Sequence, residues 1–365
     1  MIEYIIIFLV LLAGSIAFYL VYEHYFKKPG KPASSSYIEA LQLLLDGKQV
    51  TAFSKLRQVV TEDSTNLDAY LRLGQILREN KKPERALQVH KDLTLRGGLS
   101  VTDKVAILKQ LVLDYQGLND LDMAEAALRE MIELHPQDHW AHVHLLELQK
   151  KAGKWEEAYD TAVATLKLES NKSKKPLAVF KYRQGEQLYK KKEYHKARVL
   201  FKEAIGLDPS FVPAYLAIGD SYYDEERFED AVNFWNKLIT AVPDQGHQVI
   251  DRLKKTLFDL GRFSEISEIC ENILKHSPKN LEARLSLAEF FKKKGDLDAA
   301  EEILAQIVED SPQDLKSIIE LIRIYLERSE TRKINELFRN LEKRWEKLQS
   351  RPQNERIDAG LIGIS

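Results

Sequence analysis

Apolar residues, mostly alanines, recur along most of the chain at a nearly constant interval. The separations between successive members are 34, 38, 34, 39, 34, 35, 34 and 34 residues, for the series Ala52, Ala86, Ala124, Ala158, Ala197, Ala231, Ile266, Ala300 and Ile334. Self-similarity at a fixed period of this length is typical of stacked helix–turn–helix units. The apolar pattern therefore predicts an all-α chain built from repeated pairs of helices.

Three further kinds of position keep the same register. Twelve residues before some members of the series stands a small residue: Ala40, Gly74, Gly185, Gly219 or Ala288. Twelve residues after five members stands a proline: Pro136, Pro209, Pro243, Pro278 and Pro312. Large side chains fill the space between units, such as Tyr215, Tyr222, Phe228 and Trp235. Small residues let the helices of a pair approach closely, and proline ends the second helix.

This arrangement resembles the tetratricopeptide repeat, most completely in AYLAIGDSYYDEERFEDAVNFWNKLITAVP, residues 214–243. The resemblance implies a superhelical solenoid of helix pairs over residues 37–348. We expect about nine units, with extra residues between units at 101–104 and 173–177. The units are 33–66, 67–100, 105–138, 139–172, 178–211, 212–245, 247–280, 281–314 and 315–348.

The N-terminus has a different pattern. Residues 4–22, YIIIFLVLLAGSIAFYLVY, contain no charged side chain, and as a helix they would reach about 28 Å, close to the thickness of a bilayer core. A cleaved signal peptide is the alternative, but such a peptide begins with basic residues and none precedes Tyr4. The sequence therefore predicts one transmembrane helix within an N-terminal anchor, residues 1–26.

The flanks of this segment predict its orientation. Lys27, Lys28 and Lys31 follow the span, and no Lys or Arg precedes it. Because positive charge is retained on the cytoplasmic side, we expect a single-pass membrane protein whose repeats face the cytoplasm. Residues 27–36 then form a flexible stalk, and residues 349–365 a C-terminal tail.

Charge and cysteine content narrow the possible functions. The chain has 54 basic and 56 acidic side chains, a balance that gives no reason to expect nucleic acid as a partner. Its one cysteine, Cys270, excludes an intramolecular disulfide framework and any multi-cysteine zinc module. Cys270 stands where Phe201 and Trp235 stand in their units. We therefore expect a buried apolar side chain, with a reactive thiol as the alternative.

Four of the nine histidines lie in HPQDHWAHVH, residues 135–144. His142 occupies the packing position that Tyr70 and Tyr215 hold in other units, and only His139 and His142 could share a helix face. Two ligands make a poor metal site without a third. The spacing favours repeat packing over metal binding. Because phosphate loops, nucleophile elbows and HExxH motifs are also missing from the sequence, we expect neither a cofactor nor an enzyme.

A stack of helix pairs instead offers a groove lined by the first helix of each unit. The fifth, ninth and twelfth residues of a unit should face that groove, and exposed aromatic side chains beside carboxylates suit protein docking. The alternative is that the tyrosines support neighbouring helices. The predicted binding residues are Leu71, Gln75, Arg78, Tyr182, Glu186, Tyr189, Leu216, Asp220, Tyr223, Leu285, Glu289 and Lys292.

One resemblance extends beyond the repeat. An N-terminal anchor, a short stalk and the segments YIEALQLLLDGKQVTAFSKLRQVV and LRLGQILRENKKPERALQVHKDL resemble the lipopolysaccharide assembly protein B family. Arg85, Ala86 and His90 form the most similar piece, and VIDRLKKTLFDLGRF is similar too. The resemblance implies a scaffold on the cytoplasmic side of the inner membrane. That scaffold brings the lipid A deacetylase, a soluble client enzyme, to a membrane-bound protease and so restrains lipopolysaccharide synthesis.

The sequence departs from that family at its C-terminal end. Family members end in a rubredoxin-like metal module built from two cysteine pairs, whereas no cysteine follows Cys270 here. Three functions therefore remain: the lipopolysaccharide regulator; an anchored scaffold for another envelope assembly, secretion or polysaccharide export complex; and an enzyme or metal protein, which rests only on the histidines. The sequence predicts no oligomeric state.

Overall fold

The computed structural model describes residues 35–170 and 172–349. The predicted span at residues 4–22, almost all of the stalk and residues 350–365 of the tail lie outside the described residues. Within these ranges, no helix is both long enough and apolar enough to cross a membrane.

The described chain forms eighteen α-helices and no strand, which confirms the all-α prediction. The helices follow one another as pairs joined by short turns: α2 (Ser35–Leu45) and α3 (Gln49–Glu62), α4 (Leu67–Glu79) and α5 (Pro83–Thr94), α6 (Val101–Gly117) and α7 (Leu121–Leu134), α8 (His139–Lys151) and α9 (Trp155–Leu168), α10 (Ala178–Lys190) and α11 (Tyr194–Leu207), α12 (Val212–Tyr223) and α13 (Phe228–Ala241), α14 (Ile250–Asp259) and α15 (Glu265–His276), α16 (Leu281–Lys294) and α17 (Leu297–Asp310), and α18 (Leu315–Glu327) and α19 (Thr331–Gln349). Two 3₁₀ helices, η1 (Lys175–Leu177) and η2 (Pro243–Val249), precede α10 and α14.

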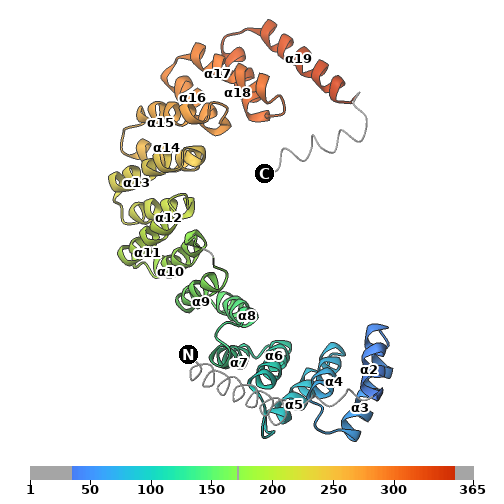
Figure 1. Ribbon diagram of the computed structural model, residues 1–365. Helices are drawn as coiled ribbons and strands as arrows, with labels where there is room; N and C mark the ends of the chain where they lie inside the picture. The colour runs from blue at the N-terminus through green and yellow to red at the C-terminus, as the bar shows by residue number, and fades with distance from the viewer. Residues whose placement is uncertain (1–34, 171, 350–365) are drawn as a thin grey trace, which may run out of the picture. The chain divides into compact units, whose positions relative to one another are not determined.

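The chain divides into two compact units, one ending at Leu148 and the other beginning at Gln149. Both units are built in the same way. The helices of a pair contact each other, and the second helix of one pair contacts the first helix of the next, as α5 contacts α6 and α11 contacts α12. In the second unit, α10, α12, α14, α16 and α18 follow one another along one side (Figure 1).

In several pairs, a ring of the second helix packs directly against a glycine of the first helix. A Cβ atom added to Gly219 of α12 would lie 2.1 Å from Nε1 of Trp235 on α13, so the indole ring occupies the space that a side chain would need. Trp235 is 2% exposed, and its Nε1 donates a hydrogen bond to the carbonyl of Leu216 at 3.4 Å. Gly185 and Phe201 make the same contact in α10 and α11. In these pairs, the small residue of the first helix therefore leaves the space that the aromatic ring of the second helix fills.

In the first unit, a histidine takes the place of the aromatic ring. A Cβ on Gly74 would lie 2.2 Å from Nε2 of His90, and this Nε2 lies 3.2 Å from the carbonyl oxygen of Leu71. The other ring nitrogen contacts the carboxylate of Asp114, which also accepts a hydrogen bond from Arg78 at 2.7 Å. His90 and Asp114 are both fully buried. The His90 ring of α5 therefore packs against α4 in its own pair and also hydrogen-bonds to α6 of the next pair.

The turn inside each described pair contains one residue with left-handed backbone geometry. Four of these residues are glycines, which adopt a positive φ without steric cost, and five carry side chains. All nine occupy the same position in the repeat: Gly47, Lys81, Asn119, Gly153, Lys192, Glu226, Gly261, Gly295 and Ser329. The turn geometry is therefore common to all pairs, although its residue type is not.

The ring-on-glycine contact predicts the effect of one methyl group. Gly219→Ala should lower the free energy of unfolding by about 1–3 kcal/mol, because the new Cβ forces the Trp235 ring out of its seat. Chemical denaturation followed by tryptophan fluorescence measures this change.

Gly206→Ala is the matched control. Gly206 is an exposed residue of α11, and no atom lies within 4 Å of the position of its added Cβ. Because alanine is the better helix former, this control should leave stability unchanged or raise it by up to about 1 kcal/mol. Equal effects of the two substitutions would show that the ring contact does not hold the pair together.

Candidate protein-binding surface

The residues predicted to bind a partner lie on the first helices of four pairs, namely α4, α10, α12 and α16. Two of them were expected at the surface but pack inside. Leu71 is 8% exposed and Leu285 is 7% exposed, and each belongs to the hydrophobic core of its own part of the array. The fifth position of these helices points toward the neighbouring helices, so these two leucines offer little area to a partner.

The three predicted tyrosines are only partly buried, and all three contact other rings. Tyr182 lies 5.5 Å from the rings of both Phe201 and Phe211, measured between centroids. Tyr223 lies 5.2 Å from Phe228 and 6.2 Å from Trp235. Burial, followed by the carboxylate of Glu186, raises the pKa of Tyr182 to about 12. These tyrosines thus have a packing role, whether or not they also contact a partner.

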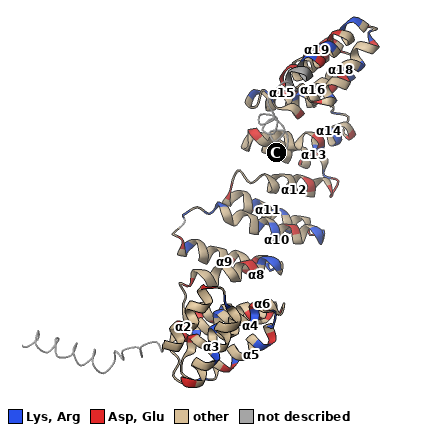
Figure 2. Ribbon diagram, turned by 90° about the vertical axis from the view of Figure 1, so that its right-hand side faces the viewer, with Lys and Arg blue, Asp and Glu red and all other residues tan. Residues whose placement is uncertain are grey.

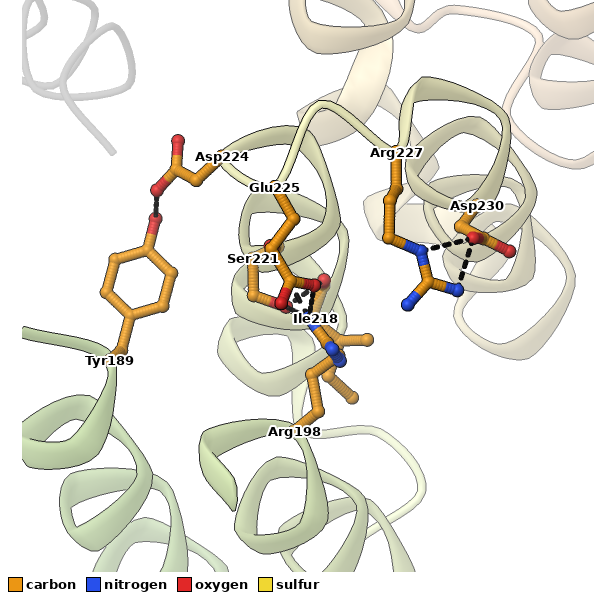
Figure 3. Close-up of polar contacts among 8 residues, drawn as sticks. All are labelled: Tyr189, Arg198, Ile218, Ser221, Asp224, Glu225, Arg227 and Asp230. Atoms are coloured by element: carbon orange, nitrogen blue, oxygen red, sulfur yellow. Dashed lines mark hydrogen bonds and ion pairs between the residues drawn. The ribbon is translucent and has the colours of Figure 1, made fainter. Parts of the chain in front are cut away.

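Tyr189 links two successive pairs. Its hydroxyl donates a hydrogen bond to the carboxylate of Asp224 at the end of α12 (Figure 3). Burial and this hydrogen bond raise the pKa of the Tyr189 phenol above its ordinary value, so the group stays protonated and remains a donor. Leu216 of α12 is half-buried and packs against the same core.

A second link between these pairs starts from the outer helix. The guanidinium group of Arg198 on α11 is almost fully buried and donates to the Ser221 hydroxyl at 3.3 Å and the Glu225 carboxylate at 2.5 Å (Figure 3). It also lies 4.2 Å from the centroid of the Tyr222 ring. Arg198 therefore joins α11 to α12 through charge, hydrogen bonds and ring contact together.

The charged residues of the predicted surface are mostly engaged within the array. Asp220 of α12 accepts from Arg252 of α14, with nitrogen–oxygen distances of 2.6 and 3.1 Å. This hydrogen bond raises the pKa of the Arg252 guanidinium group. Glu289 of α16 accepts from Lys254 of α14, and Lys292 of α16 donates to Glu320 of α18. Each of these contacts crosses from one pair to the next.

The remaining polar residues of the predicted surface are also engaged, Arg78 with the next pair and Gln75 and Glu186 within their own helices. Arg78 donates to Asp114 and to Gln110 of α6. Gln75 donates to Glu79 at 2.8 Å, and Glu186 accepts from Arg183 at 2.6 Å. Basic and acidic segments accordingly alternate along the helices and do not gather at one place (Figure 2). Most of the polar groups on the predicted surface stabilise the stack itself.

The structure adds two surface residues that the sequence reasoning left out. Phe258 of α14 is 67% exposed, and Lys255 lies one helical turn before it, with its Nζ 5.0 Å from the centroid of the Tyr223 ring. They occupy the twelfth and ninth positions of the unit 247–280. The same ninth and twelfth positions that predicted surface residues in other units therefore also point to Lys255 and Phe258 in this unit.

The histidine-rich segment has a packing role in the structure. His142 is 6% exposed, and its Nε2 lies 3.0 Å from the carbonyl oxygen of Pro136. The hydroxyl of Tyr215 makes the equivalent contact with Pro209 at 3.1 Å, which confirms that His142 occupies the tyrosine position. His144 stacks on Trp140 with centroids 3.8 Å apart. In residues 35–170 and 172–349, no group of three or more His, Cys, Asp or Glu side chains is placed to hold a metal ion.

Cys270 is fully buried in the core of the second unit, as the prediction of an apolar packing role requires. Burial raises the pKa of its thiol from 9.0 to about 12. At about pH 8 the thiolate fraction should then be about a thousandfold lower than that of an ordinary exposed cysteine. We expect N-ethylmaleimide to leave the native chain unmodified by mass spectrometry, and to modify it fully in guanidinium chloride. Rapid modification of the folded chain would contradict this burial.

Two family models agree with the repeat architecture. Residues 182–245 and 257–323 match two models of the tetratricopeptide repeat. The crystal structure of an APC/C hetero-tetramer, Cut9–Hcn1, matches with a TM-score of 0.31 at 15% identity, covering 83% of this chain and 58% of that chain.

Sequence similarity also reaches proteins of known name. Lipopolysaccharide assembly protein B of Escherichia coli strain K12 is 21% identical over 279 residues, which are 76% of this chain and 72% of that protein. The Haemophilus influenzae protein of the same name is 23% identical over 254 residues, 70% of this chain and 64% of its own length. The repeats and these relatives together indicate a non-enzymatic protein that acts through protein–protein contacts. The described chain is an all-helical solenoid that matches tetratricopeptide repeats over residues 182–245 and 257–323, and the chain is similar to lipopolysaccharide assembly protein B.

Proposed function

We propose that this chain is a repeat scaffold of the bacterial inner membrane that binds proteins and regulates lipopolysaccharide synthesis. The observation that carries the proposal is the extent of the similarity to lipopolysaccharide assembly protein B, which covers 76% of the chain. A likeness limited to the repeat consensus would be expected to follow single units. A similarity that runs through 279 residues extends over several successive units. It supports a shared role as well as a shared fold.

The scaffold would act by bringing two proteins together. Its proposed client is the lipid A deacetylase, and its proposed membrane partner is a protease that degrades that enzyme. Holding both on one chain raises the concentration of each near the other without a new contact between them. The repeats suit this role because a stack of helix pairs offers a long surface and needs no catalytic group of its own.

The proposed membrane attachment is the segment at residues 4–22, with the repeats facing the cytoplasm. Each of the two compact units has its own hydrophobic core, such as the cluster around Trp235 and Ile250 in the second unit. The repeats therefore have no structural need of the apolar segment. Attachment would serve to place the client beside a partner in the same membrane.

Removal of residues 1–26 tests the proposal. The truncated chain should be folded and soluble, should still bind the purified deacetylase, and should fail to restrain it in the cell. Immunoblots should then show accumulation of the deacetylase to the level seen when the whole gene is deleted.

A chimera in which an unrelated single span of the same orientation replaces residues 4–22 is the control, and it should restore the normal level. Full restoration by the soluble fragment at native expression would mean that attachment is dispensable. A normal deacetylase level in the complete deletion would end the lipopolysaccharide proposal and favour another envelope complex.

A further inference from the structure

Four phenylalanines and two lysines lie together where α14, α15 and α16 meet. We call this set the aromatic–lysine patch, and its members are Phe258, Phe263, Phe290, Phe291, Lys293 and Lys294. None of them belongs to the binding surface predicted from the sequence. Along the described part of the chain, it is the place where exposed aromatic area, a cavity and cationic side chains coincide.

The rings form a continuous series across two pairs of helices. Phe258 lies 6.4 Å from Phe263 in an edge-to-face arrangement, and Phe263 lies 6.0 Å from Phe290. Phe290 lies 5.6 Å from Phe291, again edge to face. Phe290 is 9% exposed and anchors the series in the core, whereas Phe258 is 67% exposed. A large apolar side chain so open to water is what an interface residue offers.

A cavity of about 520 Å³ lies beside these rings. Its lining includes Phe263, Phe290 and Phe291 on the apolar side and Lys293 and Lys294 on the other. Ser264, Ser267 and Glu271 of the α15 segment complete it. This volume is large enough for one aromatic or branched side chain with the backbone that carries it. A pocket with an apolar wall and a few polar groups is the usual form of a site for such an anchor.

The charges around the cavity are not balanced internally. Lys294 is exposed and has no ion pair within the described ranges. Lys293 lies 4.7 Å from the centroid of the Phe263 ring and 3.1 Å from Glu289, a carboxylate that Lys254 also holds. Glu271 is the one carboxylate among the lining residues. This differs from the first-helix surface, where carboxylates and cations are already paired with each other.

We propose that the aromatic–lysine patch docks an acidic segment of a partner protein, which inserts one large apolar side chain between Phe258 and the cavity while its carboxylates meet Lys293 and Lys294. This inference rests on the proposed scaffold function and specifies the chemistry of one contact. A lysine at the rim attracts carboxylates, and the exposed rings contribute the apolar burial that a charge pair alone lacks. The lysines that would contact the carboxylates of the segment lie in the C-terminal turn of α16.

The experiment uses the full-length chain in detergent and a fluorescein-labelled peptide, Glu-Asp-Glu-Phe-Glu-Asp-Leu-Glu-Asp-Glu. We expect saturable binding by fluorescence anisotropy, and weaker binding when NaCl rises from about 0.05 M to about 0.5 M, since salt screens the exposed lysines. A peptide with amides in place of its carboxylates, and one with serine in place of its phenylalanine and leucine, should both bind at least about tenfold more weakly.

Variants of the chain locate the site. Phe258→Ala and Lys294→Glu should each weaken binding by about tenfold or more. Leu326→Ala is the matched control for the first, because Leu326 of α18 is 63% exposed and holds the same position in its own repeat unit, 315–348. Lys190→Glu, at the exposed end of α10, is the control for the second. All four sites are exposed, so circular dichroism should show unchanged folding.

Three results would overturn the proposal: no peptide binding, binding that Phe258→Ala leaves intact, or binding that the uncharged peptide reproduces. Phe258-dependent sedimentation with anionic phospholipid vesicles, in the absence of peptide binding, would assign the patch to a membrane surface instead. The scaffold function fails separately. If deletion of the whole gene raises the deacetylase level but the peptide does not bind, the scaffold proposal stands and the patch proposal falls. If the peptide binds but the deletion leaves the deacetylase level unchanged, the patch binds acidic segments and the scaffold proposal falls.

Discussion

The packing of a large ring onto a glycine, seen in three of the described helix pairs, is the contact from which the account of the array starts. Trp235 occupies the space above Gly219, and His90 occupies the equivalent space above Gly74. The same rings also meet the carbonyl of the first helix, so the contact sets both the distance and the rotation of the two helices. Because the described pairs also share their turn geometry, successive pairs stack in one register.

This regular stacking determines what remains for a partner. Where pairs meet, charged side chains of the first helices lie within reach of each other, and contacts such as Asp220 with Arg252 and Lys292 with Glu320 follow. These exposed and half-exposed pairs each contribute little stability, but they occupy groups that would otherwise bind a ligand. Aromatic area beside an unpaired lysine, as at Phe291 and Lys294 in the cavity wall, is therefore the stronger basis for recognition.

The sequence predicted the architecture well because the architecture is periodic. The series of apolar residues and the turn five residues before each of its members recur at nearly fixed spacing along the described pairs, and several pairs add a ring packed on a glycine. The side chains on the first-helix surface were harder to place. Leu71 and Leu285 were expected in the groove but are buried, since a helix turns by 100° per residue and a small rotation moves a fifth position into the core. The bond between His90 and Asp114 joins residues that the repeat period does not relate, so no spacing rule could reveal it.

The central proposal is that the partner protein docked by the aromatic–lysine patch of the second unit is the proposed client, the lipid A deacetylase. Hydrogen–deuterium exchange of the full-length chain, with and without the purified lipid A deacetylase, tests this most directly. The account predicts that the client slows exchange in α14, in the turn that carries Phe263 and in the C-terminal half of α16. Slower exchange confined to the helices before Leu148, with no change around Phe258, would contradict it.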